Sequence, residues 1–200
     1  MKILFGDFCE AVKNGFRRFK IREYTEQNNI LMIIDEVQTG NGRTGKFYAY
    51  QHYDIMPDIV STAKGLAGGL PIGATLLSDK VQNVFAPGDH GSTFGGNPVS
   101  CAAALSIVNR LDDKMLQSVV AKGNKIKSAL QNQPGVTDIT GMGLMIGIKT
   151  EKPAKDVVNE LIEKGVLALT AKDKVRLLPA LNIDDETLDK AIEIIKETVC

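Results

Sequence analysis

The apolar positions of this chain alternate between short continuous runs and longer stretches with helical spacing. Residues 58–62 and 72–78 predict two strands, and residues 30–34 form a continuous apolar run of strand length, ILMII. Such a run predicts a strand that is covered on both faces, as in a parallel sheet. A helix is expected to follow Asn97-Pro98, because Asn is a good N-cap and Pro is tolerated at the first helical position. The alternation predicts an α/β fold with a mostly parallel sheet.

The pattern changes after about residue 110, where amphipathic helices alternate with short apolar segments. Residues 141–148 predict a turn and a strand, and the segments VLAL and VRLLP predict two short strands. The last helix is expected to begin at Asp184, because acidic residues follow in its first turn, where the helix dipole favours anions. The apolar residues expected on the buried faces of the first and last of these helices are Leu116, Val119, Val120, Ile126, Leu130, Leu188, Ala191, Ile192, Ile195 and Val199.

Composition and charge exclude several classes of function. The 24 basic and 24 acidic side chains cancel, so no net field attracts nucleic acid or an anionic membrane. No apolar run approaches the ~20 residues that cross a bilayer. The three cysteines and two histidines are widely spaced and indicate neither a disulfide framework nor a metal site. We therefore expect a protein of the reducing cytoplasm.

Two glycine-rich segments come close to nucleotide-binding motifs. Residues 40–46, GNGRTGK, have the glycines and lysine of a phosphate-binding loop, but Phe47 stands where a hydroxyl should reach Mg²⁺. An aromatic segment follows instead of an obvious helix, so a triphosphatase is a weak alternative. Residues 141–147, GMGLMIG, have one residue too many before the last glycine of the dinucleotide fingerprint. Close packing of a strand against a helix explains these glycines better.

A carboxylate and an amine stand at the ends of two predicted strands. Asp35 ends the first strand and Lys64 follows the second, and ligands of open α/β sheets lie outside the carboxyl ends of the strands. A lysine there is expected to be partly desolvated, which frees its amine as a nucleophile. Pyridoxal phosphate requires such a pair, an amine for its aldehyde and a carboxylate for its ring nitrogen. Spacing alone equally allows a surface Lys64 and a helix-capping Asp35.

Two long segments carry a resemblance that goes further. DEVQTGNGRTGKFYAYQHYDIMPDIVSTAKGLAGGLPIGA and GDHGSTFGGNPVSCAAAL resemble the class III pyridoxal-phosphate aminotransferases, and are most similar to the acetylornithine aminotransferases of arginine biosynthesis. This resemblance implies pyridoxal-phosphate transferase fold type I. Residues 20–110 would form a portion of the cofactor-binding large domain with part of its parallel sheet, and residues 111–200 a small C-terminal α/β domain. Residues 1–19 do not resemble the family and are interpreted as a leader.

The resemblance also assigns roles at the cofactor. Lys64 would be the catalytic lysine that forms the Schiff base with pyridoxal phosphate and moves a proton as general base and acid. Asp35 would pair with the ring nitrogen, with Glu36 beside it among the cofactor-binding residues. Val37 would pack on a ring face, and Gln38 would donate a hydrogen bond to the ring hydroxyl.

Three further residues are assigned in the same way. Thr93 would reach the cofactor phosphate in the site of a neighbouring subunit, and Ser92 would contact the substrate. Arg176 would bind the substrate α-carboxylate, because a planar guanidinium fork matches a carboxylate. As a lone residue, Arg176 fits a solvated charge at a strand end equally well.

The resemblance implies amino-group transfer between N-acetylornithine and 2-oxoglutarate in a homodimer with shared sites. It covers the second half of the family's chain, and the family's main phosphate-binding turn, its ring-stacking aromatic and a further substrate arginine are not identifiable here. Two alternatives therefore stay open. One is a truncated, non-catalytic fragment, and the other is a relative that acts on ornithine, succinylornithine or 4-aminobutyrate.

Overall fold

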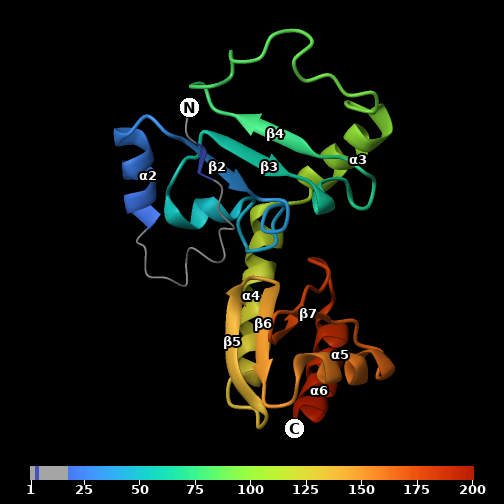
Figure 1. Ribbon diagram of the computed structural model, residues 1–200. Coiled ribbons are helices and arrows are strands. Elements are labelled where there is room, and N and C mark those ends of the chain that lie inside the picture. Colours follow the sequence, from blue (N-terminus) through green and yellow to red (C-terminus); the bar gives the residue numbers. More distant parts are fainter. Residues whose placement is uncertain (1–2, 5–17) are drawn as a thin grey trace. The chain divides into compact units, whose positions relative to one another are not determined.

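The computed structural model describes residues 3–4 and 18–200 and divides the chain into two compact units (Figure 1). Unit 1 consists of Met1–Asn41 and Lys46–Asp112, and unit 2 of Gly42–Gly45 and Asp113–Cys200. Most of the predicted leader, residues 1–19, lies outside the described residues. Within the described ranges, no helix is long and apolar enough to cross a bilayer.

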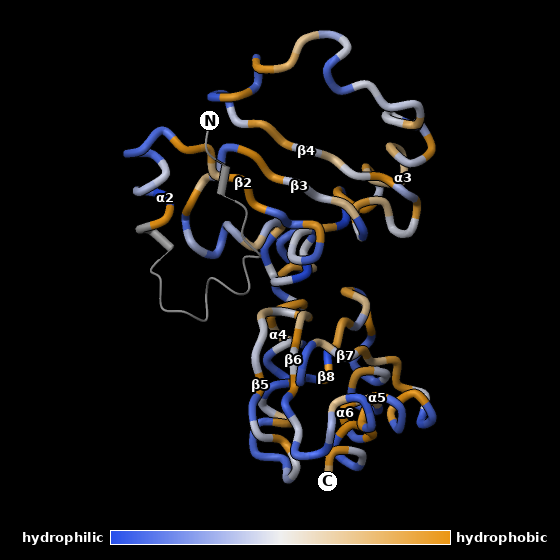
Figure 2. The backbone as a smooth tube through the Cα atoms, in the orientation of Figure 1, coloured by the Kyte–Doolittle hydropathy of each residue, from blue (hydrophilic) through white to orange (hydrophobic). Residues whose placement is uncertain are grey.

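Unit 1 is built on a four-stranded sheet in the order β1-β2-β3-β4. Its strands are β1 (Ile3–Leu4), β2 (Leu31–Asp35), β3 (Ile59–Thr62) and β4 (Ala74–Leu77). The first three strands run parallel to one another, and β4 pairs with β3 in the antiparallel direction. The predicted strands are found in β2, β3 and β4, and hydrophobic residues run along β2 and β3 (Figure 2).

Burial along β2 differs from the prediction. Met32 and Ile34 are buried, whereas Leu31 and Ile33, which alternate with them, are half-buried, so the described residues cover one face fully and the other in part. The covered face packs with Val60 and with the aromatic segment that follows β2. The expected cover of both faces is complete on one face and partial on the other, because this segment packs against one face only.

Short helices and turns complete unit 1. They are α2 (Arg18–Gln27), the 3₁₀ turns η1 (Ala49–Tyr53) and η2 (Lys64–Ala67), and α3 (Pro98–Val108). Helix α3 begins as predicted, since Asn97 Oδ1 accepts hydrogen bonds from the backbone N–H groups of Val99 at 3.0 Å and Ser100 at 3.2 Å. It packs closely on η2, where a Cβ at Gly68 would lie 3.1 Å from Ile107.

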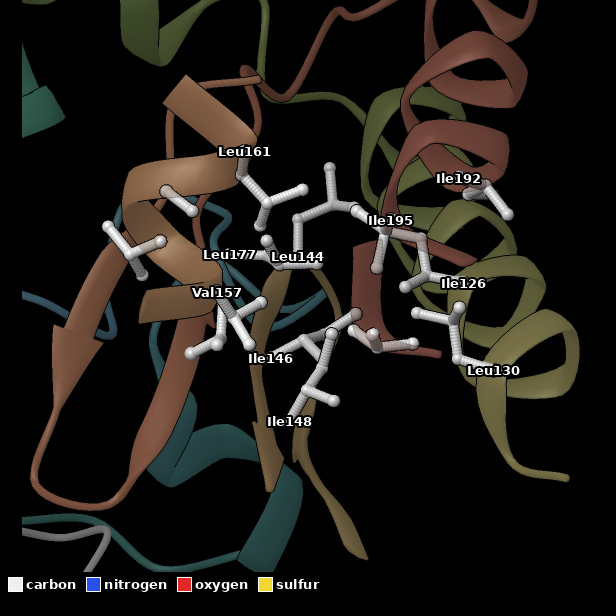
Figure 3. Close-up of a cluster of buried hydrophobic side chains, with 14 of the residues drawn as sticks. Ile126, Leu130, Leu144, Ile146, Ile148, Val157, Leu161, Leu177, Ile192 and Ile195 are labelled. Carbon is white, nitrogen blue, oxygen red and sulfur yellow. The ribbon is translucent and has the colours of Figure 1, made fainter. Parts of the chain in front are cut away.

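Unit 2 combines an antiparallel sheet with three amphipathic helices. The sheet has the order β5-β6-β8-β7, with β5 (Val136–Met142), β6 (Met145–Thr150), β7 (Leu169–Ala171) and β8 (Lys174–Leu177). The helices are α4 (Asp113–Leu130), α5 (Ala154–Glu163) and α6 (Asp185–Val199). Their apolar faces and the buried residues of β6 and β8 form one core (Figure 3).

Several details of unit 2 correct the sequence interpretation. Residues 141–148 belong to a β5–β6 hairpin with the two-residue turn Gly143–Leu144, and β5 itself was not predicted. Of the VLAL segment only Leu169 lies in a strand. Val120 was expected to be buried on α4 but is 39% exposed. The start of α6 is confirmed, because Asp184 is its N-cap and accepts a hydrogen bond from Thr187 N.

A glycine lets α4 approach the β5–β6 turn. A Cβ at Gly123 would overlap the carbonyl group of Gly143, so only a residue without a side chain fits there. This is the close packing that the sequence indicated for the GMGLMIG segment.

We predict that Gly123→Ala lowers the free energy of unfolding by about 2 kcal/mol or more, although Ala favours helices, because the helix must move off the turn. Denaturant unfolding measures this change. Gly165→Ala is the matched control, because a Cβ there meets no atom within 4 Å. Its cost, from the left-handed φ of 86°, should be about 1 kcal/mol. Equal losses in the two variants would contradict the close approach.

A buried carboxylate ties α2 to the sheet of unit 1. Asp58, just before β3, accepts hydrogen bonds from Arg22 Nη1 at 2.9 Å and from Met32 N at 2.7 Å, both through Oδ2. Burial alone would raise the pKa of Asp58, but the bonds from Arg22 and Met32 outweigh it and hold this pKa below its usual value. The ionised form of Asp58 is therefore stabilised by the fold.

Because the folded pKa of Asp58 is depressed, its contribution to stability is complete above the unfolded pKa of about 3.9. It is lost as the pH falls through the lower folded pKa. We predict that Asp58→Asn lowers the free energy of unfolding by about 3 kcal/mol at neutral pH and flattens the loss of stability in acid. Circular dichroism across a pH series tests this. Asp79→Asn, at an exposed carboxylate, is the control and should leave the acid profile unchanged.

Candidate active site

The candidate site lies at the carboxyl ends of β2 and β3. Asp35 is the last residue of β2 and stands opposite Ser61 of β3 in the parallel register. Lys64 follows β3 and opens the turn η2. Because the two strands run in the same direction, Asp35 and Lys64 leave the sheet at the same edge, where open α/β sheets bind ligands.

Asp35 faces solvent and is held through one oxygen. Its Oδ1 accepts hydrogen bonds from Val37 N at 2.9 Å and from Ser61 Oγ at 3.2 Å. No helix begins at this point in the described chain, because turns and bends follow β2 as far as Tyr48. The helix-capping interpretation of Asp35 is therefore wrong. Ser61 was not among the predicted site residues, although the strand register would have identified it.

Glu36 has the opposite environment to its neighbour. Its side chain is 0% exposed, with Oε1 accepting from Tyr50 N at 2.9 Å and Oε2 accepting from the Thr39 hydroxyl. Its own backbone N–H donates to Ser61 O at 2.9 Å. Both carboxylate oxygens of Glu36 thus fasten the turn after β2, and its cofactor-binding role stays a prediction.

Two tyrosines pack beside this buried carboxylate. Burial raises the pKa of the Tyr48 and Tyr50 hydroxyls, and the charge of Glu36 adds to the rise in both. Tyr48 also shares a side-chain hydrogen bond with Thr62, the last residue of β3. The two phenols therefore remain protonated at neutral pH, and one of them supports the end of the strand that leads to Lys64.

Lys64 itself is exposed, with a left-handed backbone φ of 51°. The expected partial desolvation is wrong, because the η2 turn directs Leu66 and Ala67 inward and leaves Lys64 on the outside. Val37 is half-buried and Gln38 is exposed in the turns after β2, next to Asp35 in the chain.

Ser92 and Thr93 lie on the exposed connection between β4 and α3. A turn closes here through a hydrogen bond from Gly95 N to Ser92 O at 3.3 Å. The N–H groups of Val99 and Ser100 at the start of α3 are bonded to Asn97 Oδ1, so the chain itself caps this helix.

Arg176 belongs to unit 2, in the middle of β8. It pairs in register with Gly147 of β6 and Leu169 of β7, and its neighbours Val175 and Leu177 point into the core. Because side chains alternate along a strand, Arg176 lies on the sheet face opposite the core. Its substrate-binding role stays a prediction.

The glycine-rich loop has a packing role. Arg43 Nη1 donates to Pro179 O at 2.6 Å and to Leu144 O at 3.2 Å, and burial lowers the pKa of this guanidinium. Only a short 3₁₀ turn follows, at Ala49–Tyr53, so the helix that a phosphate-binding loop needs is not there. The triphosphatase interpretation loses its structural basis. In the described residues, no group of three metal-binding side chains occurs either.

The residues at the sheet edge fit the ring end of pyridoxal phosphate. An exposed carboxylate that hydrogen bonds already orient can hold a protonated ring nitrogen, and an exposed amine at the same edge can bond to the aldehyde. The small neighbours Ala63 and Gly65 leave the backbone beside Lys64 uncrowded, since a Cβ at Gly65 would meet nothing closer than Asn41 at 3.9 Å.

Comparison with known proteins finds relatives along most of the chain. The family model described as aminotransferase class-III matches residues 11–199. An acetylornithine aminotransferase of Haemophilus ducreyi is 53% identical over 86% of this chain and 44% of its own length. One from Aquifex aeolicus is 46% identical over 89% of this chain and 47% of its own. This chain thus spans less than half the length of these two relatives.

Solved structures give the same result for the fold. The structure of an ornithine aminotransferase from Plasmodium yoelii aligns with 90% of this chain, and the alignment covers 50% of the Plasmodium chain. The TM-score is 0.80 and the sequence identity is 35%. An acetylornithine aminotransferase from Elizabethkingia anophelis covers the same shares, with a TM-score of 0.80 and 36% identity.

Proposed function

Since the chain belongs to the class III aminotransferases, we propose that it serves amino-group transfer between N-acetylornithine and 2-oxoglutarate with pyridoxal phosphate. The expected fold, part of fold type I of the pyridoxal-phosphate transferases, is confirmed by the structural neighbours. The substrate is supported by the relatives from Haemophilus ducreyi and Aquifex aeolicus, both named acetylornithine aminotransferases. The observation that carries the proposal is the common sheet edge of Asp35 and Lys64.

Each of these two residues has a defined task. When bound, pyridoxal phosphate supplies an aldehyde and a protonated ring that accepts electron density from the substrate Cα. The Asp35 carboxylate keeps a proton on the ring nitrogen, and Val37 N and Ser61 Oγ hold that carboxylate in place. The Lys64 amine binds the cofactor and moves the proton at the substrate Cα.

The proposal extends to a cytoplasmic homodimer in which Thr93 and Ser92 serve the neighbouring subunit's site and Arg176 holds a substrate carboxylate. Large apolar side chains near Thr93 support an association there, since Phe94 is 84% and Val99 65% exposed. Burying such residues against a second subunit would be favourable.

We predict that Lys64→Ala abolishes the visible absorbance that pyridoxal phosphate acquires on binding, because the attaching amine is gone. Borohydride reduction followed by mass spectrometry should place the fixed cofactor on Lys64 in the wild-type chain and find none there in the variant. Lys46→Ala, at another exposed lysine of unit 1, is the control and should behave as wild type. Equal labelling of many lysines in all three proteins would show surface reaction only and remove the catalytic proposal.

Ornithine is a second candidate amino donor, because ornithine aminotransferases are close structural neighbours at 35% identity. We predict that kcat/KM is at least about tenfold higher for N-acetylornithine, since a site shaped for a neutral acetamide leaves the ammonium of ornithine poorly paired. Parallel assays with 2-oxoglutarate and each donor measure the ratio. A ratio below one would move the proposal to ornithine, while no turnover with either would favour a non-catalytic chain.

A further inference from the structure

We propose that Asn41 is a positioning residue for Lys64, and that its side-chain amide fixes the backbone from which the lysine projects. This inference rests on the proposed attachment of the cofactor to Lys64. Asn41 lies six residues after Asp35 in the chain, in the loop that follows β2. It belongs to the GNGRTGK segment, but no role was assigned to it from the sequence.

The Asn41 side chain reaches across to the end of β3. Asn41 is 7% exposed, and its Nδ2 donates to Ala63 O at 2.9 Å and to Thr62 Oγ1 at 3.2 Å. Thr62 is in turn bonded to the buried Tyr48. The two residues before Lys64 are therefore both held by one buried amide, which connects the loop after Asp35 to the end of the strand that precedes Lys64.

The backbone held in this way is an unusual one. Ala63 is extended, with a φ of −165°, and Lys64 directly after it has a left-handed φ of 51°. A left-handed lysine is unfavourable and persists only where its surroundings impose it. Ala63 O also accepts a hydrogen bond from Leu66 N at 3.2 Å, which closes the turn. The amide of Asn41 and the N–H of Leu66 thus hold the same carbonyl.

Asparagine suits position 41 for two reasons. Its own φ is 55°, a left-handed value that Asn tolerates better than most residues. The acceptor at Ala63 is a carbonyl, so the side chain must donate, which Asn does and Asp in its ionised form does not.

Two variants separate the backbone requirement from the hydrogen bonds. Asn41→Gly keeps the left-handed conformation and removes the amide, while Asn41→Asp keeps the shape and replaces the donor with an acceptor. Asn29→Gly is the matched control, since Asn29 is an exposed asparagine with a left-handed φ of 50° before β2.

The first readout is hydrogen exchange at the Leu66 amide of the full chain without cofactor. We expect exchange about tenfold faster in both Asn41 variants, the effect of losing a hydrogen bond of ordinary strength. In the Asn41 variants, the amide of Val60 in β3 should exchange at the wild-type rate. In the Asn29→Gly control, the Leu66 amide should do the same. Unchanged exchange at Leu66 in both variants would overturn the inference, whatever the chain does with pyridoxal phosphate.

The second readout is the ratio of Lys64 to Lys46 labelling by pyridoxal phosphate and borohydride, quantified on peptides. Both Asn41 variants should lower this ratio about tenfold at equal folded fraction, because only the placement of Lys64 has changed. A purely structural role for Asn41 would lower the melting temperature and leave the ratio intact, which would also overturn the inference.

The readouts distinguish this inference from the function on which it rests. If the wild-type chain shows no preference for Lys64, the proposed cofactor attachment fails, and the positioning role fails with it. If the wild type prefers Lys64 and the Asn41 variants prefer it equally, the proposed function stands and only the role of Asn41 is lost.

Discussion

Strands β2 and β3 are joined by parallel hydrogen bonding in a register that sets Asp35 opposite Ser61. This pairing determines which side chain of the acidic pair faces outward, because successive residues of a strand point to opposite faces. A slip by one residue would bring Glu36 to the solvent side and turn Asp35 inward. It would also separate Asp35 from the hydroxyl of Ser61 that orients it.

The buried carboxylate of Glu36 protects that register. Its oxygens accept from Tyr50 N and the Thr39 hydroxyl, so the turn after β2 closes around a charge that has partners only in this arrangement. A slip would take the carboxylate away from Tyr50 N and the Thr39 hydroxyl and leave both buried donors without a partner, which is costly. The two adjacent acidic residues therefore have different roles. Glu36 holds the backbone of the turn, and Asp35 faces the side where a ligand would bind.

The sequence predicted those features that depend on local pattern. The strands β2 to β4, the cap at Asn97, the cap at Asp184 and the shared edge of Asp35 and Lys64 all follow from short-range signals. Strand β5 was missed because VTDITGM carries polar residues on both faces, and only its pairing with β6 makes it a strand.

Other features depend on contacts that no local pattern records. The interior position of Glu36 depends on Tyr50, 14 residues later, and the amide contact of Asn41 depends on Ala63, 22 residues later. The solvent exposure of Lys64 follows from the way in which η2 buries Leu66 and Ala67. The sequence therefore identified Asp35, Glu36 and Lys64 as site residues. It did not predict which of them are buried or which distant residues they contact.

The passage of Gly42–Gly45 into unit 2 has a consequence for how the chain acquires its structure. Arg43 leaves the ribosome 101 residues before the first of its carbonyl acceptors, Leu144, and 136 residues before the second, Pro179. Loops of that length close at an entropic cost and slow the folding that depends on them. The two hydrogen bonds of Arg43 therefore depend on slow, long-range closure, and a piece that begins at residue 113 would lack the guanidinium that its carbonyls bind.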